Sequence, residues 1–165
     1  MKKFLCLLFA CMGVMAYANE NNLVKNPDFA HTYAPGKASY WSMSSKTAVF
    51  KPGATGGVME LAANNKHSAL LQEMKFSCDQ DVTLTMSFEY CGTAQINGTL
   101  HAVGADGKEL RIKGRNCKST ASSEFKTISS KLVIPAGTRQ LRIALRCYGE
   151  GKATFKSVKL IPVNQ

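Results

Sequence analysis

The sequence predicts an all-β domain, either a sandwich or a barrel, and two observations carry this prediction. First, apolar residues recur at every second position in the clearest segments, 82–90 and 141–147. This period is typical of strands with one face in a core and the other in water. Second, turn residues separate about ten such segments at intervals of roughly 8–12 residues, as in β-sandwiches and β-barrels.

The predicted strands follow one another from residue 23 to residue 163. In order, they are Leu23–Phe29, Lys46–Lys51, Val58–Ala62, Ser68–Phe76, Val82–Tyr90, Thr99–Val103, Glu109–Lys113, Phe125–Ile134, Leu141–Cys147 and Ala153–Val163. The chain contains no internal repeat, low-complexity tract or linker, so these strands are expected to form one domain.

Glycine and proline mark the turns between the strands. We expect a loop at Pro52–Gly57, a hairpin turn at Gly104–Gly107, and turns at Pro135–Gly137 and Gly149–Gly151. Asn97-Gly98-Thr99 matches a glycosylation sequon. Because Asn-Gly is favoured in tight turns, we predict a turn there.

Residues 1–18 have the features of a secretory signal peptide. Lys2 and Lys3 precede an uncharged apolar run, and Ala16-Tyr17-Ala18 places small residues where a signal peptidase cuts. The predicted domain is therefore residues 19–165, located outside the cell or in the periplasm. A second interpretation makes Leu8–Cys11 a lipoprotein box in which Cys11 carries the lipid. No later segment is long and apolar enough for an integral membrane span.

Removal of this segment changes both the charge and the cysteine count. The full chain has a formal net charge of +10, and the two lysines of the signal are its only charged residues. Four cysteines remain, and an even number in an exported chain favours disulfides. They are Cys78, Cys91, Cys117 and Cys147.

The spacing of these cysteines argues against structural zinc, because it contains no C-x-x-C and no nearby histidine cluster. Three pairings are open. Strand parity points Cys91 outward and Cys147 inward, which disfavours a bond between those two. We therefore expect a disulfide from Cys117 to either Cys91 or Cys147.

Catalytic signatures are missing from the sequence. Its histidines are His31, His67 and His101, and no nucleophile elbow, metalloprotease motif, P-loop or dinucleotide fingerprint occurs. Glycosidases need two opposed carboxylates, but Asp79 and Asp81 fall in a predicted turn, where aspartate is common. We expect a protein without catalytic activity and without a cofactor.

Three groups of residues resemble carbohydrate-binding-module-like domains of the galactose-binding-like superfamily. The opening Asn22–Phe29 with Trp41 is similar to theirs, as are Ser68–Gln72 with Val82–Tyr90. The three closing strands form the third group. The resemblance implies a jelly-roll β-sandwich of two antiparallel sheets that binds carbohydrate. Members often hold calcium with acids where this chain has Ala30, Lys156 and Ser157, so we expect no calcium or other metal there.

Sugar recognition needs exposed aromatic rings beside planar polar groups. Tyr33 and Tyr40 fall in the first loop and Tyr148 falls on an outward strand position, so these three are candidates for stacking. Trp41 is expected in the core, with ligand contact as the alternative.

Strand parity also defines a candidate binding face. If Leu100, Leu110, Ile112, Leu141 and Ile143 point inward, one sheet face collects a basic set of side chains. The set is Thr85, Ser87, Glu89, His101, Arg111, Lys113, Arg142, Arg146 and Tyr148. It is interpreted either as an ordinary solvated surface or as a site for an acidic glycan, because arginine forks bind anions in a bidentate manner.

Two functions follow from these observations. The first is a secreted, non-catalytic glycan-binding protein whose partner is a sulfated, sialylated or uronate-containing polysaccharide. The second is a structural or adhesive module of the cell envelope that binds a protein or an acidic surface polymer. A nucleic-acid partner is not expected, because the chain is exported and carries no recognition motif.

Overall fold

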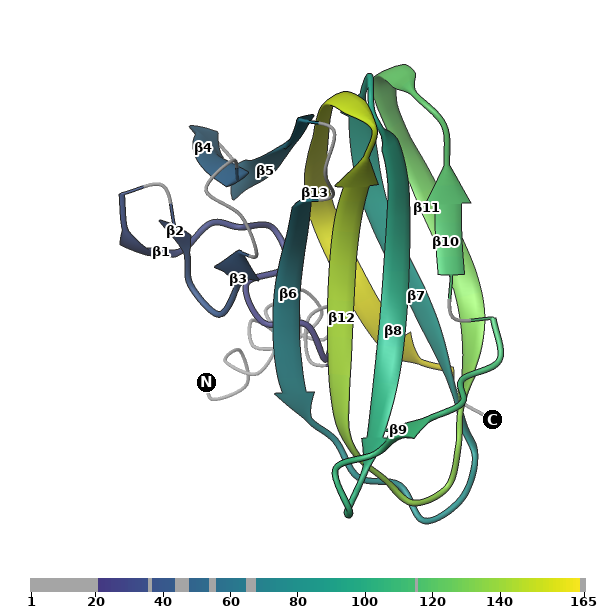
Figure 1. Ribbon diagram of the computed structural model, residues 1–165. Coiled ribbons are helices and arrows are strands. Elements are labelled where there is room, and N and C mark those ends of the chain that lie inside the picture. The colour runs from purple at the N-terminus through teal and green to yellow at the C-terminus, as the bar shows by residue number, and fades with distance from the viewer. Residues whose placement is uncertain are drawn as a thin grey trace, which may run out of the picture.

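The computed structural model describes residues 21–35, 37–43, 48–53, 56–64, 68–114 and 116–163. Within these ranges the chain forms strands β1 to β13 and no helix. Two antiparallel sheets lie face to face across one core (Figure 1). The predicted all-β sandwich is therefore confirmed. The proposed signal peptide, residues 1–18, lies outside the described residues.

The front sheet in Figure 1 has the order β10-β8-β12-β6-β3, and β9 pairs with β8. Its strands are β3 (Ser42–Met43), β6 (Ser68–Lys75), β8 (Gln95–Gly104), β9 (Glu109–Leu110), β10 (Asn116–Ser119) and β12 (Thr138–Tyr148).

The back sheet has the order β11-β7-β13-β5-β4. Its strands are β4 (Ala48–Gly53), β5 (Gly56–Asn64), β7 (Val82–Gly92), β11 (Ser122–Ile134) and β13 (Glu150–Pro162). A separate two-stranded ribbon joins β1 (Thr32–Ala34) to β2 (Lys37–Ala38).

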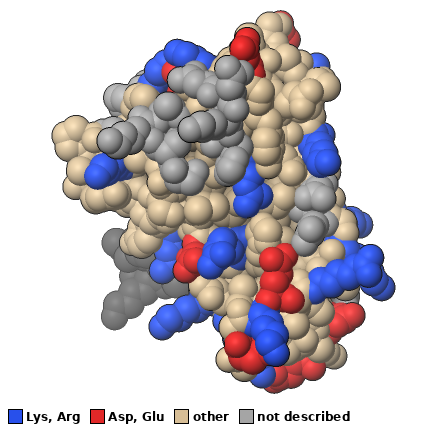
Figure 2. Space-filling view, in the orientation of Figure 1, with Lys and Arg blue, Asp and Glu red and all other residues tan. Residues whose placement is uncertain are grey.

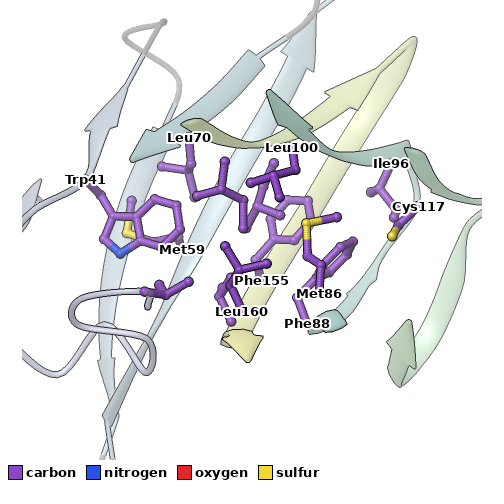
Figure 3. Packing of buried hydrophobic residues seen from close by; sticks show 14 of the residues in the cluster. Trp41, Met59, Leu70, Met86, Phe88, Ile96, Leu100, Cys117, Phe155 and Leu160 are labelled. Atoms are coloured by element: carbon purple, nitrogen blue, oxygen red, sulfur yellow. The ribbon is translucent and has the colours of Figure 1, made fainter. Parts of the chain in front are cut away.

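The alternating pattern of the sequence builds the core between the sheets (Figure 3). On β7, the inward side chains from Leu84 to Tyr90 are buried while the outward ones stay partly exposed. Phe88 meets Phe155 of β13 with a ring-centroid distance of 5.8 Å. Trp41 is 3% exposed and packs on Phe29 at 5.2 Å. Trp41 is thus a core residue, as expected.

The segment Leu23–Phe29 is irregular, although a strand was predicted. Positive φ angles at Asn26 (50°) and Phe29 (54°) interrupt the extended backbone. The buried Asn26 side chain accepts a hydrogen bond from the His31 N–H and donates to the carbonyls of His31 and Ser39. Asn26 therefore ties together the two ends of the segment that carries the β1–β2 ribbon.

The sequence Asn97-Gly98-Thr99 lies inside β8, so the predicted turn there is wrong. Gly98 is required by packing and not by a turn. A Cβ at this position would lie 2.3 Å from a carbon of the Phe88 ring. Because Gly98 has no side chain, the Phe88 ring of the back sheet can approach the front sheet closely.

All four described cysteines are free thiols, so the predicted disulfide is wrong. Cys117 and Cys147 point inward on β10 and β12, and β8 lies between these strands. Two strand spacings separate their backbones by about 10 Å, which is beyond disulfide reach. Cys91 points outward from the other sheet, as parity predicted, so it meets neither thiol.

Candidate functional site

Outward side chains of the front sheet form rows across β6, β12 and β8. Arg142 lies opposite His101 and Glu73, and Arg146 lies opposite Asn97 and Ala69. Between these rows, Ala144 lies opposite Thr99 and Leu71, and beyond them Tyr148 lies opposite Gln95. The structure therefore brings four predicted site residues together on one face: His101, Arg142, Arg146 and Tyr148.

Four other predicted members of this face, Thr85, Ser87, Glu89 and Lys113, lie elsewhere. Glu89, like Thr85 and Ser87, is on β7 and points outward from the back sheet. Arg111 lies just beyond β9, and Lys113 forms a bridge to Val133 of β11. The predicted single face was wrong, because parity separates inward from outward positions but does not assign a strand to a sheet.

Glu89 has a local ionic partner in the back sheet. Its carboxylate lies 3.1 Å from Lys156 Nζ. Partial burial opposes ionisation, but hydrogen bonds from Lys156 and Ser157 and the charges of Lys156 and Lys159 outweigh it. The pKa of Glu89 is consequently below its ordinary value.

Charges on the front face are mixed, contrary to the strongly basic face predicted from the sequence. Arg142 pairs with Glu73 through Nε at 2.8 Å and Nη2 at 2.6 Å. Figure 2 shows acidic and basic side chains interspersed over the lower half of this view. Arg142 is therefore largely neutralised by its neighbour.

Arg146 differs from Arg142, because the described residues give it no acidic partner. Its Nη1 instead donates a hydrogen bond to Thr99 Oγ1 at 2.6 Å. The guanidinium reaches diagonally from its own row to the next one, where the small Ala144 leaves room for it. Arg146 thus supplies a half-buried positive charge near the middle of the front face.

Thr99 continues into a chain of polar contacts. Its Oγ1 lies 3.2 Å from His101 Nε2, and His101 Nδ1 lies 3.0 Å from a carboxylate oxygen of Glu109. Together with the bond from Arg146, these contacts form a four-residue chain across the face, which we call the Arg146–Glu109 chain. Its members come from β12, β8 and β9.

Asn97, directly across from Arg146, has an unsatisfied acceptor. Its Oδ1 is buried, and no hydrogen-bond donor in the described part of the chain reaches it. Buried polar atoms nearly always have a partner in native proteins. Asn97, Thr99 and Glu109 were not among the predicted site residues. The expected turn at Asn97 hid the alternation that places Asn97, Thr99 and His101 on one face.

The three candidate tyrosines occupy two places. Tyr148 is half-buried at the end of the Arg146 strand. Tyr33 and Tyr40 are 64% and 63% exposed on the ribbon segment, which lies beyond β6 and β3 in Figure 1. Lysines accompany both rings: Lys37 Nζ lies 6.0 Å from the Tyr33 ring and Lys25 Nζ lies 5.3 Å from that of Tyr40.

Carboxylates elsewhere have structural partners. Asp81 accepts a hydrogen bond from the Ala136 N–H at 2.9 Å, and Asp79 pairs with Arg139 at 2.9 Å. Both lie in the connection between β6 and β7, and their partners come from the distant residues Ala136 and Arg139. Among the described residues, no group of three or more His, Cys, Asp or Glu side chains could hold a metal ion. The expectation that calcium does not bind near Ala30, Lys156 and Ser157 stays a prediction.

Solved structures with the same fold are mainly carbohydrate-binding modules. A family 61 module in complex with β-1,4-galactotriose matches with a TM-score of 0.61 and 16% identity, covering 86% of this chain and 99% of that one. A putative sugar-binding protein from Bacteroides thetaiotaomicron matches with a TM-score of 0.60 and 12% identity, covering 86% and 100%.

A bacteriophage CBA120 tailspike also contains this fold, with a TM-score of 0.70 and 12% identity over 86% of this chain. This chain spans only 21% of the tailspike domain. No protein-family model and no curated protein matches the sequence. The chain thus has the jelly-roll sandwich of carbohydrate-binding modules, and the resemblance noted in the sequence is confirmed at the level of fold. No helix in the described ranges is long and apolar enough to cross a membrane.

Proposed function

We propose that the protein is an exported, non-catalytic glycan-binding domain that prefers acidic glycans. The single observation that supports this function is Arg146, a half-buried guanidinium on the front face without an acidic partner among the described residues. Anions are the natural ligands of such a group, since its planar fork matches a carboxylate or a sulfate. The carbohydrate-binding modules that share the fold support glycan as the carrier of the anion.

Tyrosines would add stacking to this charge recognition. Tyr148 lies at the end of the same strand as Arg146 and offers a ring to the apolar face of a sugar. Tyr33 and Tyr40 form a second place where a longer glycan could stack, beside Lys37 and Lys25. His101 and Arg142 share a row that lies two rows away from Arg146, and they would contact neighbouring sugar units.

A glycan array with sulfated, sialylated and uronate-bearing members tests the function. Wild-type protein should bind acidic members more strongly than their neutral counterparts, and Arg146→Ala should remove this preference. Lys108→Ala is a matched control, because Lys108 is an exposed cation that pairs with Asp106 in the β8–β9 turn. Absence of binding to every array member by demonstrably folded protein would refute the proposal.

Export is the second part of the proposal, and it rests on the signal-like residues 1–18. N-terminal sequencing of protein from a bacterial host should find Asn19 as the first residue. An acylated Cys11 at the N-terminus would instead establish the lipoprotein alternative.

The lysines of the back sheet favour an envelope-binding role as a second candidate. Lys51, Lys131, Lys152, Lys156 and Lys159 point outward from this sheet, against three acids at its described outward positions, Glu60, Glu89 and Glu150. Such a face would attract an acidic surface polymer through long-range charge. This role would be supported if the protein binds to envelope extracts, if salt abolishes the binding, and if free sugars do not compete with it.

A further inference from the structure

We infer that Arg146 and Asn97 form a subsite for one sugar residue that carries a carboxylate or sulfate next to a free hydroxyl group. The inference also assigns a positioning role to Thr99, His101 and Glu109, which hold the guanidinium in place. It rests on the proposed glycan-binding function and specifies which chemical group the front face selects.

The direction of each hydrogen bond in the Arg146–Glu109 chain follows from chemistry. A guanidinium can only donate, so Thr99 Oγ1 accepts from Arg146 Nη1. The single hydroxyl proton of Thr99 is then available for His101 Nε2, which accepts it when the imidazole carries its proton on Nδ1. His101 Nδ1–H in turn donates to Glu109. Every link has one donor and one acceptor, so the chain is internally consistent.

This chain fixes a side chain that is otherwise flexible. Arginine has many rotamers, and a ligand that binds a disordered arginine must first restrict them. Here the Thr99 contact uses one guanidinium N–H, and the other guanidinium N–H groups have no side-chain partner among the described residues. The remaining guanidinium N–H groups can donate hydrogen bonds to the oxygen atoms of a carboxylate or sulfate.

Asn97 supplies the complementary half of the subsite. It lies directly across the ladder from Arg146, at a separation of about 5 Å between the two Cβ atoms. Its buried Oδ1 has no donor among the described residues. A ligand that satisfies both residues needs an anionic acceptor for Arg146 and an O–H donor for Asn97. An acidic sugar with a neighbouring hydroxyl has this pair of groups.

The residues beside the pair are small and buried: Ala69 is 3% exposed and Ala144 is 0% exposed. Ala69 lies on the other side of Arg146, and Ala144 is its neighbour along β12. A larger side chain at either position would compete with the guanidinium for space. The proposed subsite and the two alanines beside it therefore come from three strands of the front sheet. These residues are Ala69 of β6, Asn97 of β8, and Ala144 and Arg146 of β12.

The hydroxyl–imidazole–carboxylate order resembles that of hydrolase triads, but the geometry favours positioning over catalysis. Thr99 is only 5% exposed, and its Oγ1 already accepts a bond from Arg146. A nucleophile must reach a substrate carbonyl. Thr99 is consequently assigned as a positioning residue, and ester hydrolysis becomes an outcome of the test.

The test compares Thr99→Val with Thr99→Ser. Valine keeps the shape of threonine and loses the hydroxyl, whereas serine keeps the hydroxyl. The probes are hexagalacturonate and 3′-sialyllactose, each paired with its neutral form, methyl-esterified hexagalacturonate and lactose. Affinities are measured by titration calorimetry, and melting temperatures confirm that each variant is folded.

Thr99→Val should reduce the ratio of acidic to neutral affinity about tenfold, the effect of losing one hydrogen bond to a charged group. Thr99→Ser should retain the ratio, and Asn97→Ala should weaken binding of acidic and neutral probes alike. If wild-type protein binds no acidic probe over its neutral form, the acidic preference of the proposed function fails together with the subsite.

If wild-type protein prefers the acidic form and Thr99→Val leaves the preference unchanged, only the positioning role is overturned. Hydrolysis of p-nitrophenyl acetate is measured as release of p-nitrophenol. If wild type and Thr99→Ser release it and Thr99→Val does not, Thr99 has a catalytic role and not a positioning role. Unchanged binding in Asn97→Ala would remove Asn97 from the subsite.

Discussion

At the scale of single residues, Gly98 shows how a small side chain can determine the contact between the two sheets. The Phe88 ring occupies the space where any other residue would place its Cβ. A substitution must push this ring away or bend β8, and the core has no spare volume for either movement.

Gly98→Ala should therefore lower the free energy of unfolding by about 1–3 kcal/mol, the usual range for overpacking a core. Gly104→Ala is the control, since its nearest neighbour is the movable Asp106 carboxylate at 3.2 Å. Urea denaturation measures both variants. Equal stability of the two variants would show that the Phe88 contact is easily relaxed.

The cysteines provide a second prediction at this scale. Burial raises the pKa of the Cys117 and Cys147 thiols, with hydrogen bonds opposing it only in part. Cys91 is partly exposed on the back sheet. Native protein treated with a thiol reagent at pH 8 should react first at Cys91, and denatured protein should react at all four described positions. Blocked thiols after denaturation without reductant would reveal a disulfide.

At this scale the sequence predicted the direction of each side chain better than it predicted which residues lie next to one another. Alternation correctly pointed Cys91 outward and Cys147, Leu100 and Ile143 inward, because the direction of a side chain is a local property of a strand. It could not place Glu89, because the sheet to which β7 belongs depends on how the chain crosses between sheets. Asn97 was missed because the Asn-Gly pair suggested a turn, although Thr99 and His101 both fell within the predicted strand Thr99–Val103.

At the scale of elements, β11 is an edge strand with features that oppose unwanted pairing. Its register against β7 shifts between Ser122 and Lys126. Phe125, in the shifted part, is 40% exposed and lies under Lys156 Nζ at 4.0 Å from its ring. Irregular register and charge are the usual protections of an open edge.

Glu89 links β7, the strand next to this edge, to β13 through Lys156, and the link depends on pH. Because the pKa of Glu89 is lowered on folding, its ionised form stabilises the native state above the ordinary glutamate range. This stabilisation disappears as the pH falls through the lowered value. Glu89→Gln should therefore be less stable than wild type at pH 7 and nearly equal to it at pH 2–3.

Thermal melts at several pH values measure this difference. Glu124→Gln is a suitable comparison, because Glu124 is exposed on β11 and its carboxylate forms no ion pair with another described residue. A constant difference between Glu89→Gln and wild type at all pH values would contradict the ionic contribution of Glu89.

At the scale of the whole molecule, the two outer faces of the sandwich are chemically different. The front face combines paired charges with the central Arg146, whereas the back face places lysines around the hydroxyls of Thr85, Ser87 and Ser129. Salt should weaken contacts of the back face more, because exposed charges are screened and half-buried ones much less.

The double variant Lys131→Glu/Lys159→Glu should therefore reduce retention on a sulfated polysaccharide column without changing oligosaccharide selectivity. Arg146→Ala should have the opposite profile. Elution salt and calorimetric affinity measure the two effects separately. Loss of both properties in either variant would mean that one surface serves both functions.

The fold itself was predictable at this scale, since nine of the ten predicted strands overlap strands of the structure. The exception, Leu23–Phe29, is held by side-chain hydrogen bonds from Asn26, which periodicity does not detect. The missed elements β1, β2, β3 and β10 have two to four residues each, too few to show a period.

The hydrogen bonds of Asn26 also have a consequence for how this surface can vary. Because its side chain holds His31 and Ser39, and the Ser39 N–H donates to the His31 carbonyl at 2.8 Å, residues 31–39 leave and rejoin the sandwich at one closed base. Ala38 of the ribbon is buried in the core, whereas Tyr33 is exposed. The exposed ribbon positions can therefore vary while Ala38 keeps the core intact, and they are the natural place to graft a new recognition loop onto this scaffold.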